Sequence, residues 1–218
     1  MIRTMADVQI ESIEVPLLQA RQAAPLALRL VARAQTMGFL PTSHSDRIEL
    51  DRAFLEQLAG QLRRNGVAAI ASGSLAHAAK AEPVNDGDLV DALRATLEAV
   101  DASPHPKGEW APARELLGDE LLARLLRVSV SSLRRYAAGE RRTPDAVAWR
   151  LHLIARLLAA LIGSYNDYGI RRWFERPRAA LDGSTPREVL ERAETEDDEQ
   201  VEQLLELAEQ LTGAAAAS

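Results

Sequence analysis

The chain has 218 residues, 47% of them hydrophobic and 27% charged, a formal net charge of −6 and no cysteine. This composition is typical of a globular protein with one sizeable core or two small ones, and it excludes disulfide frameworks, thiolate metal sites and thiol catalysis. Because Ala, Leu and Arg occupy segments where a β-protein would carry Val, Ile and Tyr, we expect an all-α fold, and the lack of cysteine makes the cytoplasm the expected location.

No segment has the pattern of a signal peptide or of a membrane span. Charged residues interrupt the apolar positions of the first thirty residues, and the longest apolar run, 151–163, contains Arg156. Neither pattern provides the continuous apolar stretch that insertion into a bilayer needs. We therefore expect no membrane partner.

Residues 1–100 are predicted to form a mostly helical N-terminal region, to which the sequence assigns no role. The 3.6-residue spacing of apolar positions predicts amphipathic helices over 48–62 and 88–100. Between them, the small residues of 66–74 are predicted to form a short strand and a turn. The segment 101–108 contains two prolines and a glycine, which predicts a linker.

Residues 109–163 are predicted to contain a helix-turn-helix. Asp119 is a suitable cap for a first short helix, whose inward side is formed by Leu121, Leu122, Leu125 and Leu126. A turn at Arg127 and Val128 follows. DNA-binding turns often carry glycine at such a position, so either Arg127 adopts a positive φ or the turn has another form.

The second helix of this unit is predicted over 130–138. Ser129 is its expected N-cap, Leu133 faces inward and Gly139 closes it. In a helix-turn-helix, the N-terminal part of the second helix enters the major groove. The residues expected to contact DNA, in this helix and in the loop after it, are Ser129, Val130, Ser131, Arg134, Arg135, Arg141 and Arg142.

Charge is distributed unevenly along the chain. Residues 124–142 hold six arginines against Glu140 alone, whereas residues 181–218 hold eleven Asp and Glu against two arginines. Arginines suit phosphates, and their planar guanidinium group matches two acceptors of guanine. The alternative to a DNA-binding unit is an ordinary αα-hairpin with an arginine-rich exposed side. The alternative to two binding surfaces is that solvated helix faces segregate charge without binding a partner.

A long helix is predicted to begin with Thr143 as N-cap and Pro144 in its first turn, and to end at Gly163. Apolar residues occupy a second face of this helix as well, at Leu153, Leu157 and Ala160. Such a helix is buried on most sides, either within its own domain or against a second copy of the chain. The second possibility predicts a homodimer.

Residues 164–218 carry an ordered series of turn, capping and apolar signals: Trp173, Pro177, Leu181, Gly183, Ser184, Thr185, Pro186, Val189 and Leu190, then an acidic gap, then Val201, Leu204 and Leu205. This order resembles the toxin-binding module of Xre/MbcA/ParS-type antitoxins, which pair with RES-domain toxins. The likeness covers about residues 110–212, including the helix-turn-helix that many members of the family carry.

The resemblance implies an antitoxin that forms a hetero-oligomer with an NAD⁺-degrading RES-type toxin and neutralises this toxin through its C-terminal module. It also implies that the chain represses its own operon by binding operator DNA. The residues it assigns to toxin contact are Arg172, Trp173, Pro177, Leu181, Gly183, Pro186, Val201 and Leu205. For Trp173 and Phe174 the alternative is a core pair that holds short helices together. Two features depart from the family: the long N-terminal region, and a tail, 213–218, that contains only small side chains.

The sequence gives no indication of an enzyme, a metal site or a cofactor. The histidines are dispersed at 44, 77, 105 and 152, without the spacing of a zinc site, and Ser74 lacks the Gly-x-Ser-x-Gly pattern of a nucleophile. Two other functions stay open. One is a stand-alone helix-turn-helix transcriptional regulator whose residues 1–106 act as a sensor; the other is a protein adaptor that does not bind DNA.

Overall fold

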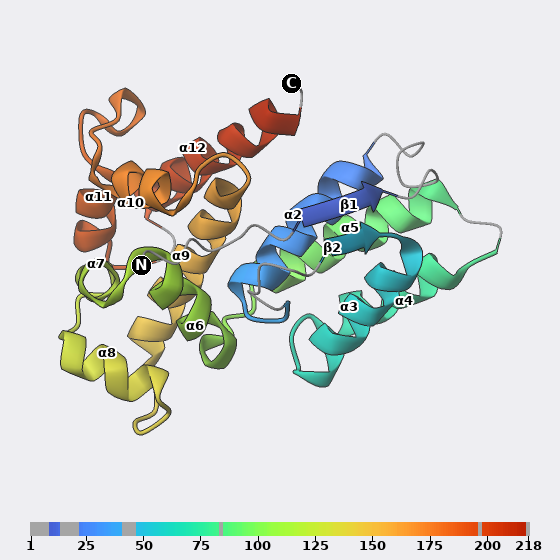
Figure 1. Cartoon of the computed structure of the whole chain (residues 1–218), viewed down its shortest axis with the longest axis horizontal. Coiled ribbons are helices and arrows are strands. Elements are labelled where there is room, and N and C mark those ends of the chain that lie inside the picture. The colour runs from blue at the N-terminus through green and yellow to red at the C-terminus, as the bar shows by residue number, and fades with distance from the viewer. Residues whose placement is uncertain (1–8, 14–21, 41–46, 83–84, 196–197, 217–218) are drawn as a thin grey trace. The chain divides into compact units, whose positions relative to one another are not determined.

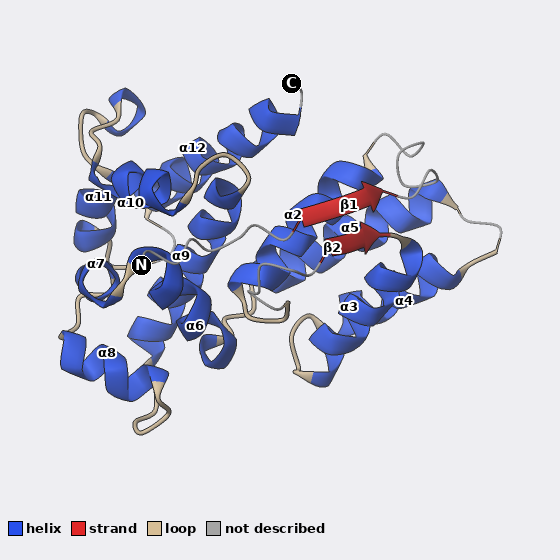
Figure 2. Cartoon of the chain, in the orientation of Figure 1, coloured by secondary structure: helices blue, strands red, loops and turns tan. Residues whose placement is uncertain are grey.

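The computed structural model describes residues 9–13, 22–40, 47–82, 85–195 and 198–216. The chain forms two compact units, residues 6–104 and residues 105–218, and the division falls inside the segment predicted as a linker (Figure 1). The described residues are all-α apart from two short strands (Figure 2). Among them, no helix is both long enough and apolar enough to cross a lipid bilayer.

The unit of residues 6–104 is a small helical bundle with a two-stranded parallel sheet. Its elements are β1 (Gln9–Ile13), α2 (Ala23–Thr36), β2 (Arg47–Leu50), α3 (Arg52–Arg64), α4 (Ala69–Lys80) and α5 (Asp86–Asp101). Helix α4 packs between α3 and α5, and α2 packs on α5. The two strands pair in parallel because α2 forms the crossover between them. A buried guanidinium, that of Arg33, donates to Asp101 across 2.7 Å and joins α2 to α5.

Two predictions for this unit are wrong. The helix predicted over 48–62 begins only at Arg52, because Asp51 adopts an extended conformation and its side chain caps the backbone N–H of Phe54; Leu50 belongs to β2. The segment 66–74, predicted as a strand and a turn, instead leads into α4. Its small side chains carry no strand-forming signal of their own, and alanine favours helix once the backbone has turned at Gly66.

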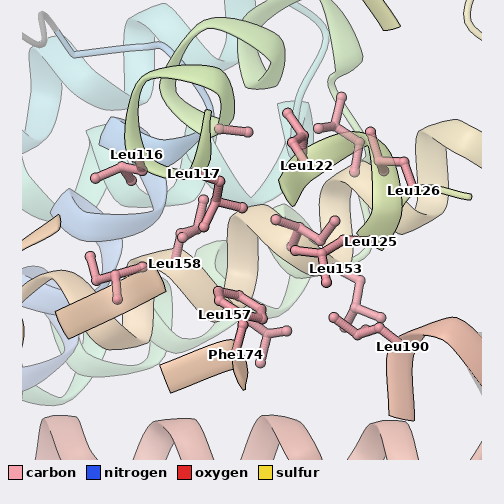
Figure 3. Packing of buried hydrophobic residues seen from close by; sticks show 14 of the residues in the cluster. Leu116, Leu117, Leu122, Leu125, Leu126, Leu153, Leu157, Leu158, Phe174 and Leu190 are labelled. Carbon is pink, nitrogen blue, oxygen red and sulfur yellow. The ribbon is translucent and has the colours of Figure 1, made fainter. Parts of the chain in front are cut away.

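The unit of residues 105–218 contains the helix-turn-helix and the C-terminal module around a single core. Its elements are α6 (Pro106–Leu117), α7 (Asp119–Leu125), α8 (Val130–Ala137), α9 (Asp145–Ile162), α10 (Asp167–Glu175), the 3₁₀ turn η1 (Ala179–Leu181), α11 (Pro186–Arg192) and α12 (Glu199–Ala216). Helix α6 starts at Pro106, so part of the predicted linker is helical. Figure 3 shows leucines of α6, α7 and α9 meeting Phe174 of α10 and Leu190 of α11.

Helix α9 is the centre of this core. It packs against α6, α10 and α12, and Leu153, Leu157 and Ala160 on its second face are buried within the same unit. The first of the two possibilities for this face therefore holds, and the face offers no surface to a second copy. The predicted regions 109–163 and 164–218 share one core through this helix.

The start of α9 differs from the prediction by one residue. The helix begins at Asp145 with Pro144 as its N-cap residue. The side chain of Thr143 does not cap the helix; its hydroxyl accepts a hydrogen bond of 3.2 Å from the indole nitrogen of Trp110 in α6. The end at Gly163 is as predicted.

Candidate nucleic-acid interface and partner-binding module

Helices α7 and α8 form the predicted helix-turn-helix. Arg127 has φ +57°, as the missing glycine of the turn requires. The backbone N–H of Arg127 donates to the carbonyl of Arg124, and that of Val128 donates to the carbonyl of Ala123, each across 3.0 Å. These two bonds complete a Schellman motif, which explains why a left-handed residue is needed immediately after the helix.

The capping residues that the sequence predicts for the second helix are in place at both ends. The hydroxyl of Ser129 accepts a hydrogen bond of 3.1 Å from the backbone N–H of Ser132, which fixes the start of α8. Gly139 has φ +72° and lies immediately after the C-cap residue Ala138. The helix is one residue shorter than predicted.

Helix α8 has one buried face and one exposed face. Leu133 and Tyr136 belong to the core, and the Tyr136 ring stacks on Trp110 of α6 with centroids 6.2 Å apart. The opposite face consists of exposed residues at i, i+3, i+4 and i+7, which form one continuous surface of the helix. We call this set the α8 stripe; its members are Ser131, Arg134, Arg135 and Ala138.

The other residues predicted to contact DNA surround this stripe. Ser129, Arg141 and Arg142 are exposed beside it. Val130 is the exception, because it is half-buried and packs against the core. Val130 thus helps to hold α8 on its unit, and its contact with DNA stays a prediction.

Asp119 has a different role from the predicted one. Gly118 is the N-cap residue of α7, and the Asp119 carboxylate instead accepts hydrogen bonds from two guanidinium groups. Arg114 of α6 donates through Nε across 2.8 Å, and Arg134 of the α8 stripe donates through Nε across 2.7 Å. These two cations hold the pKa of Asp119 below its usual range, and the hydrogen bond from Arg114 has the larger effect.

The positive charge of the interface is smaller than the segment 124–142 indicates. Besides Asp119, Glu194 lies 3.2 Å from Arg127 and Asp145 lies 3.5 Å from Arg142, and all three carboxylates come from outside that segment. Arg124 and Arg135 are exposed and have no ion-pair partner among the residues that the structure describes. On the α8 stripe, the whole guanidinium of Arg135 is therefore open to a ligand, whereas Arg134 shares its Nε with Asp119.

The C-terminal module contains the residues of the antitoxin-like order, but half of the predicted toxin contacts are buried. Trp173 is 1% exposed and packs edge-on against Phe174, with ring centroids 5.2 Å apart, which is the core-pair alternative. Leu181, Pro186 and Val201 are also buried. Direct contact with a partner through these four residues is therefore wrong for this fold, because the chain itself covers them.

The turn between α10 and α11 gives several of these residues a structural role. Asp182 and Gly183 have φ of 52° and 81°, which reverses the chain after η1. Thr185 and Glu188 form the predicted capping box at the start of α11, and the hydrogen bond from the Thr185 backbone keeps the pKa of Glu188 below its usual range. Pro186 occupies the first turn of that helix.

A buried arginine that the sequence analysis did not single out fixes this module to α9. The guanidinium of Arg150 donates to the carbonyl oxygens of Leu190 and Ala193 at the end of α11. It thereby satisfies carbonyl groups that the helix leaves unpaired. In the sequence, the available signal was an arginine among the apolar residues of this helix, a signal that Arg156 shares.

Several residues of the module remain accessible to a partner. Arg172, Pro177 and Gly183 are exposed as predicted, and Leu205 is half-buried. Tyr168, which was not predicted, is 66% exposed, and its hydroxyl accepts a hydrogen bond of 2.9 Å from Arg172. The i, i+4 spacing of the two residues was the available signal. Helix α12 buries its apolar side on the unit and exposes an acidic side that includes Glu199, Glu202 and Glu206.

Residues 217 and 218 of the predicted tail and His44 lie outside the described residues. Within the described part of the chain, no group of three His, Cys, Asp or Glu side chains is arranged to hold a metal ion. No family model, no curated protein and no solved structure matches the chain.

Proposed function

We propose that the chain is an antitoxin that binds operator DNA through α8 and neutralises a RES-type toxin through the module formed by α10, η1, α11 and α12. The DNA-binding part rests on one observation above all: the α8 stripe is solvent-exposed on the second helix of a closed helix-turn-helix. The toxin-binding part is supported by the order of residues from Trp173 to Leu205.

The DNA-binding proposal requires a helix that enters the major groove and cations that reach the edges of the bases there. Leu133 and Tyr136 anchor α8 on its unit, while Arg134 and Arg135 extend from the opposite face. Arg141 and Arg142 follow in the exposed loop, where cations suit flanking phosphates. This arrangement matches the docking of a helix-turn-helix, in which base contacts come from the second helix.

Binding to duplex DNA and its salt dependence test this part. Duplexes selected from a randomised pool by the full-length chain are expected to bind more tightly than an unselected duplex. The affinity is expected to fall steeply with salt concentration, because arginines that neutralise phosphates release counterions. If no sequence is enriched and binding does not depend on salt, α8 does not bind DNA and the adaptor function is favoured.

The toxin-binding proposal concerns the exposed part of the module. Tyr168 and Arg172 form an exposed aromatic and guanidinium pair, of the residue types that dominate binding energy at protein interfaces. The acidic side of α12 complements the cationic entrance expected of an enzyme that binds a dinucleotide phosphate. The two surfaces belong to one unit and together offer a partner one aromatic anchor and one charged face.

Co-expression with a RES-domain toxin encoded beside this chain tests the proposal through cell growth and NAD⁺ content. Growth arrest that persists when the chain is present would contradict it. Removal of 195–218 is a poor test, because it also removes Val201 and Leu204 from the core. The double variant Glu202→Gln, Glu206→Gln changes only the exposed acidic side of α12. The control is the double variant Glu82→Gln, Glu98→Gln, which removes the same charge from two exposed acids of the other unit.

A stand-alone transcriptional regulator is the second candidate. It is favoured by the fact that residues 6–104 form a compact unit with its own core, which the antitoxin function does not use. The two candidates differ in one measurement. A regulator represses its promoter without protecting cells from any RES-type toxin, whereas an antitoxin does both.

A further inference from the structure

We infer that Asp119 sets the guanidinium of Arg134 to read a guanine in the major groove, so that Asp119 is a positioning residue for sequence recognition. The inference rests on the proposed DNA binding by α8 and names the base that this helix reads. It gives a function to a carboxylate that otherwise lies in an interface where an anion opposes binding to phosphate.

Arg114 holds the carboxylate of Asp119 in place independently of Arg134. Arg114 donates to its Oδ1 through Nε across 2.8 Å and to its Oδ2 through Nη2 across 3.3 Å. Such a paired contact fixes the plane of the carboxylate. Asp119 is 15% exposed, which leaves it little freedom to turn away. The network thus connects α6, α7 and α8 in a fixed order: Arg114, Asp119, Arg134.

The atom through which Arg134 is held determines what it can still bind. Its Nε donates to Oδ2 of Asp119 across 2.7 Å, while the side chain remains 62% exposed. The two Nη groups make no hydrogen bond among the described residues, and they carry the donors that match O6 and N7 of guanine. Because the side chain is already ordered, less conformational entropy is lost when the base is bound.

The simplest alternative is that Asp119 only cancels the charge of Arg134. The two roles predict opposite results when the carboxylate is neutralised. If Asp119 is a counter-charge, its removal strengthens binding to every duplex, because one negative charge leaves the interface. If Asp119 positions Arg134, its removal weakens the preference for the selected sequence even though the net charge becomes more favourable.

The experiment compares Asp119→Asn with Asp145→Asn in the full-length chain. Asp145 is the matched control, because its carboxylate lies beside Arg142 in the same interface but contacts no residue of the α8 stripe. The specific probe is a duplex selected from a randomised pool by the wild-type chain, and the non-specific probe is an unselected duplex of the same length. The measured quantity is the ratio of the two affinities.

Asp119→Asn is expected to lower this ratio about tenfold, with equal or tighter binding to the unselected duplex, whereas Asp145→Asn is expected to leave the ratio unchanged. Arg134→Ala is expected to lower the ratio to a similar extent. In the Arg134→Ala background, Asp119→Asn is expected to have no further effect, which a merely structural role of Asp119 would not produce.

A measurement on the wild-type chain keeps the test independent of how the variants fold. Replacing the guanine at one position of the selected duplex with 7-deazaguanine, which lacks the N7 acceptor, is expected to lower the ratio for the wild type and not for Arg134→Ala. A ratio that survives Asp119→Asn, or equal tightening on both duplexes, overturns the inference alone. Failure of the wild type to select any sequence overturns the proposed DNA binding as well.

Discussion

The α8 stripe and the module from α10 to α11 use their most distinctive side chains in opposite ways. Helix α8 is held by two core residues, Leu133 and Tyr136, and presents its arginines to solvent. Helix α10 instead buries Trp173 and Phe174 and leaves Tyr168 and Arg172 outside. A substitution in the stripe should therefore change binding far more than stability, whereas one in the buried part of the module should change stability first.

The largest effect is expected for Trp173→Ala. Trp173 is fully enclosed by the core, so its truncation should lower the free energy of unfolding by about 3–5 kcal/mol. Denaturant unfolding measures the change. Tyr168→Ala on the same helix is the control and should cost no more than about 0.5 kcal/mol, because its ring is exposed. If both variants were equally stable, the distinction between the buried and exposed sides of α10 would not hold.

Arg150→Met is expected to have the next largest effect. The variant keeps an apolar stem but leaves the carbonyl groups of Leu190 and Ala193 without their donor, at a cost of about 2–3 kcal/mol in unfolding free energy. Arg176→Met, in the exposed C-cap position of α10, is the matched control. An unchanged midpoint for Arg150→Met would mean that α11 does not depend on this contact.

The double variant Arg134→Ala, Arg135→Ala tests the exposed residues of the α8 stripe. It should abolish sequence-specific DNA binding, with a loss of about 1–3 kcal/mol for each base contact, and leave toxin binding intact. The fold should lose only the small contribution of the exposed ion pair between Arg134 and Asp119. The control is the double variant Arg63→Ala, Arg64→Ala, which removes the same charge from two exposed arginines of α3 in the other unit. Simultaneous loss of DNA and toxin binding would instead indicate unfolding.

A change of pH is expected to have the smallest effect, a change in the contribution of Asp119 to the free energy of unfolding. Because the pKa of Asp119 is lower in the folded chain than its ordinary value of 3.8, its ion pairs stabilise the fold above that value, and this contribution is lost as the pH falls through the folded-state pKa. The stability difference between the wild type and Asp119→Asn should therefore be constant near neutral pH and shrink in strong acid. Unfolding measured against pH gives this difference; one that grew on acidification would contradict the ion-pair assignment.

Local signals in the sequence were sufficient where one residue determines a local conformation. Ser129, Gly139 and Gly163 mark helix ends because capping depends on bonds within a few residues, and the capping box of Thr185 and Glu188 was found for the same reason. The apolar spacing likewise predicted which side of α8 is buried. At 66–74 the same approach was wrong, because small side chains leave the backbone conformation to the packing around it.

Contacts between distant segments were not available from the sequence. The carboxylates that pair with Arg127 and Arg134, and the carbonyls that accept from Arg150, come from other helices, so a count of charges within one segment overestimates the positive charge of the interface. Sequence by itself determined the all-α class, the helix-turn-helix and the helix ends marked by Ser129, Gly163 and Thr185, since these follow from local hydrogen bonding and periodicity. Tertiary structure alone decided which residues of the module are covered and which arginines are paired, because burial and ion pairing depend on distances between segments that the order of residues does not specify.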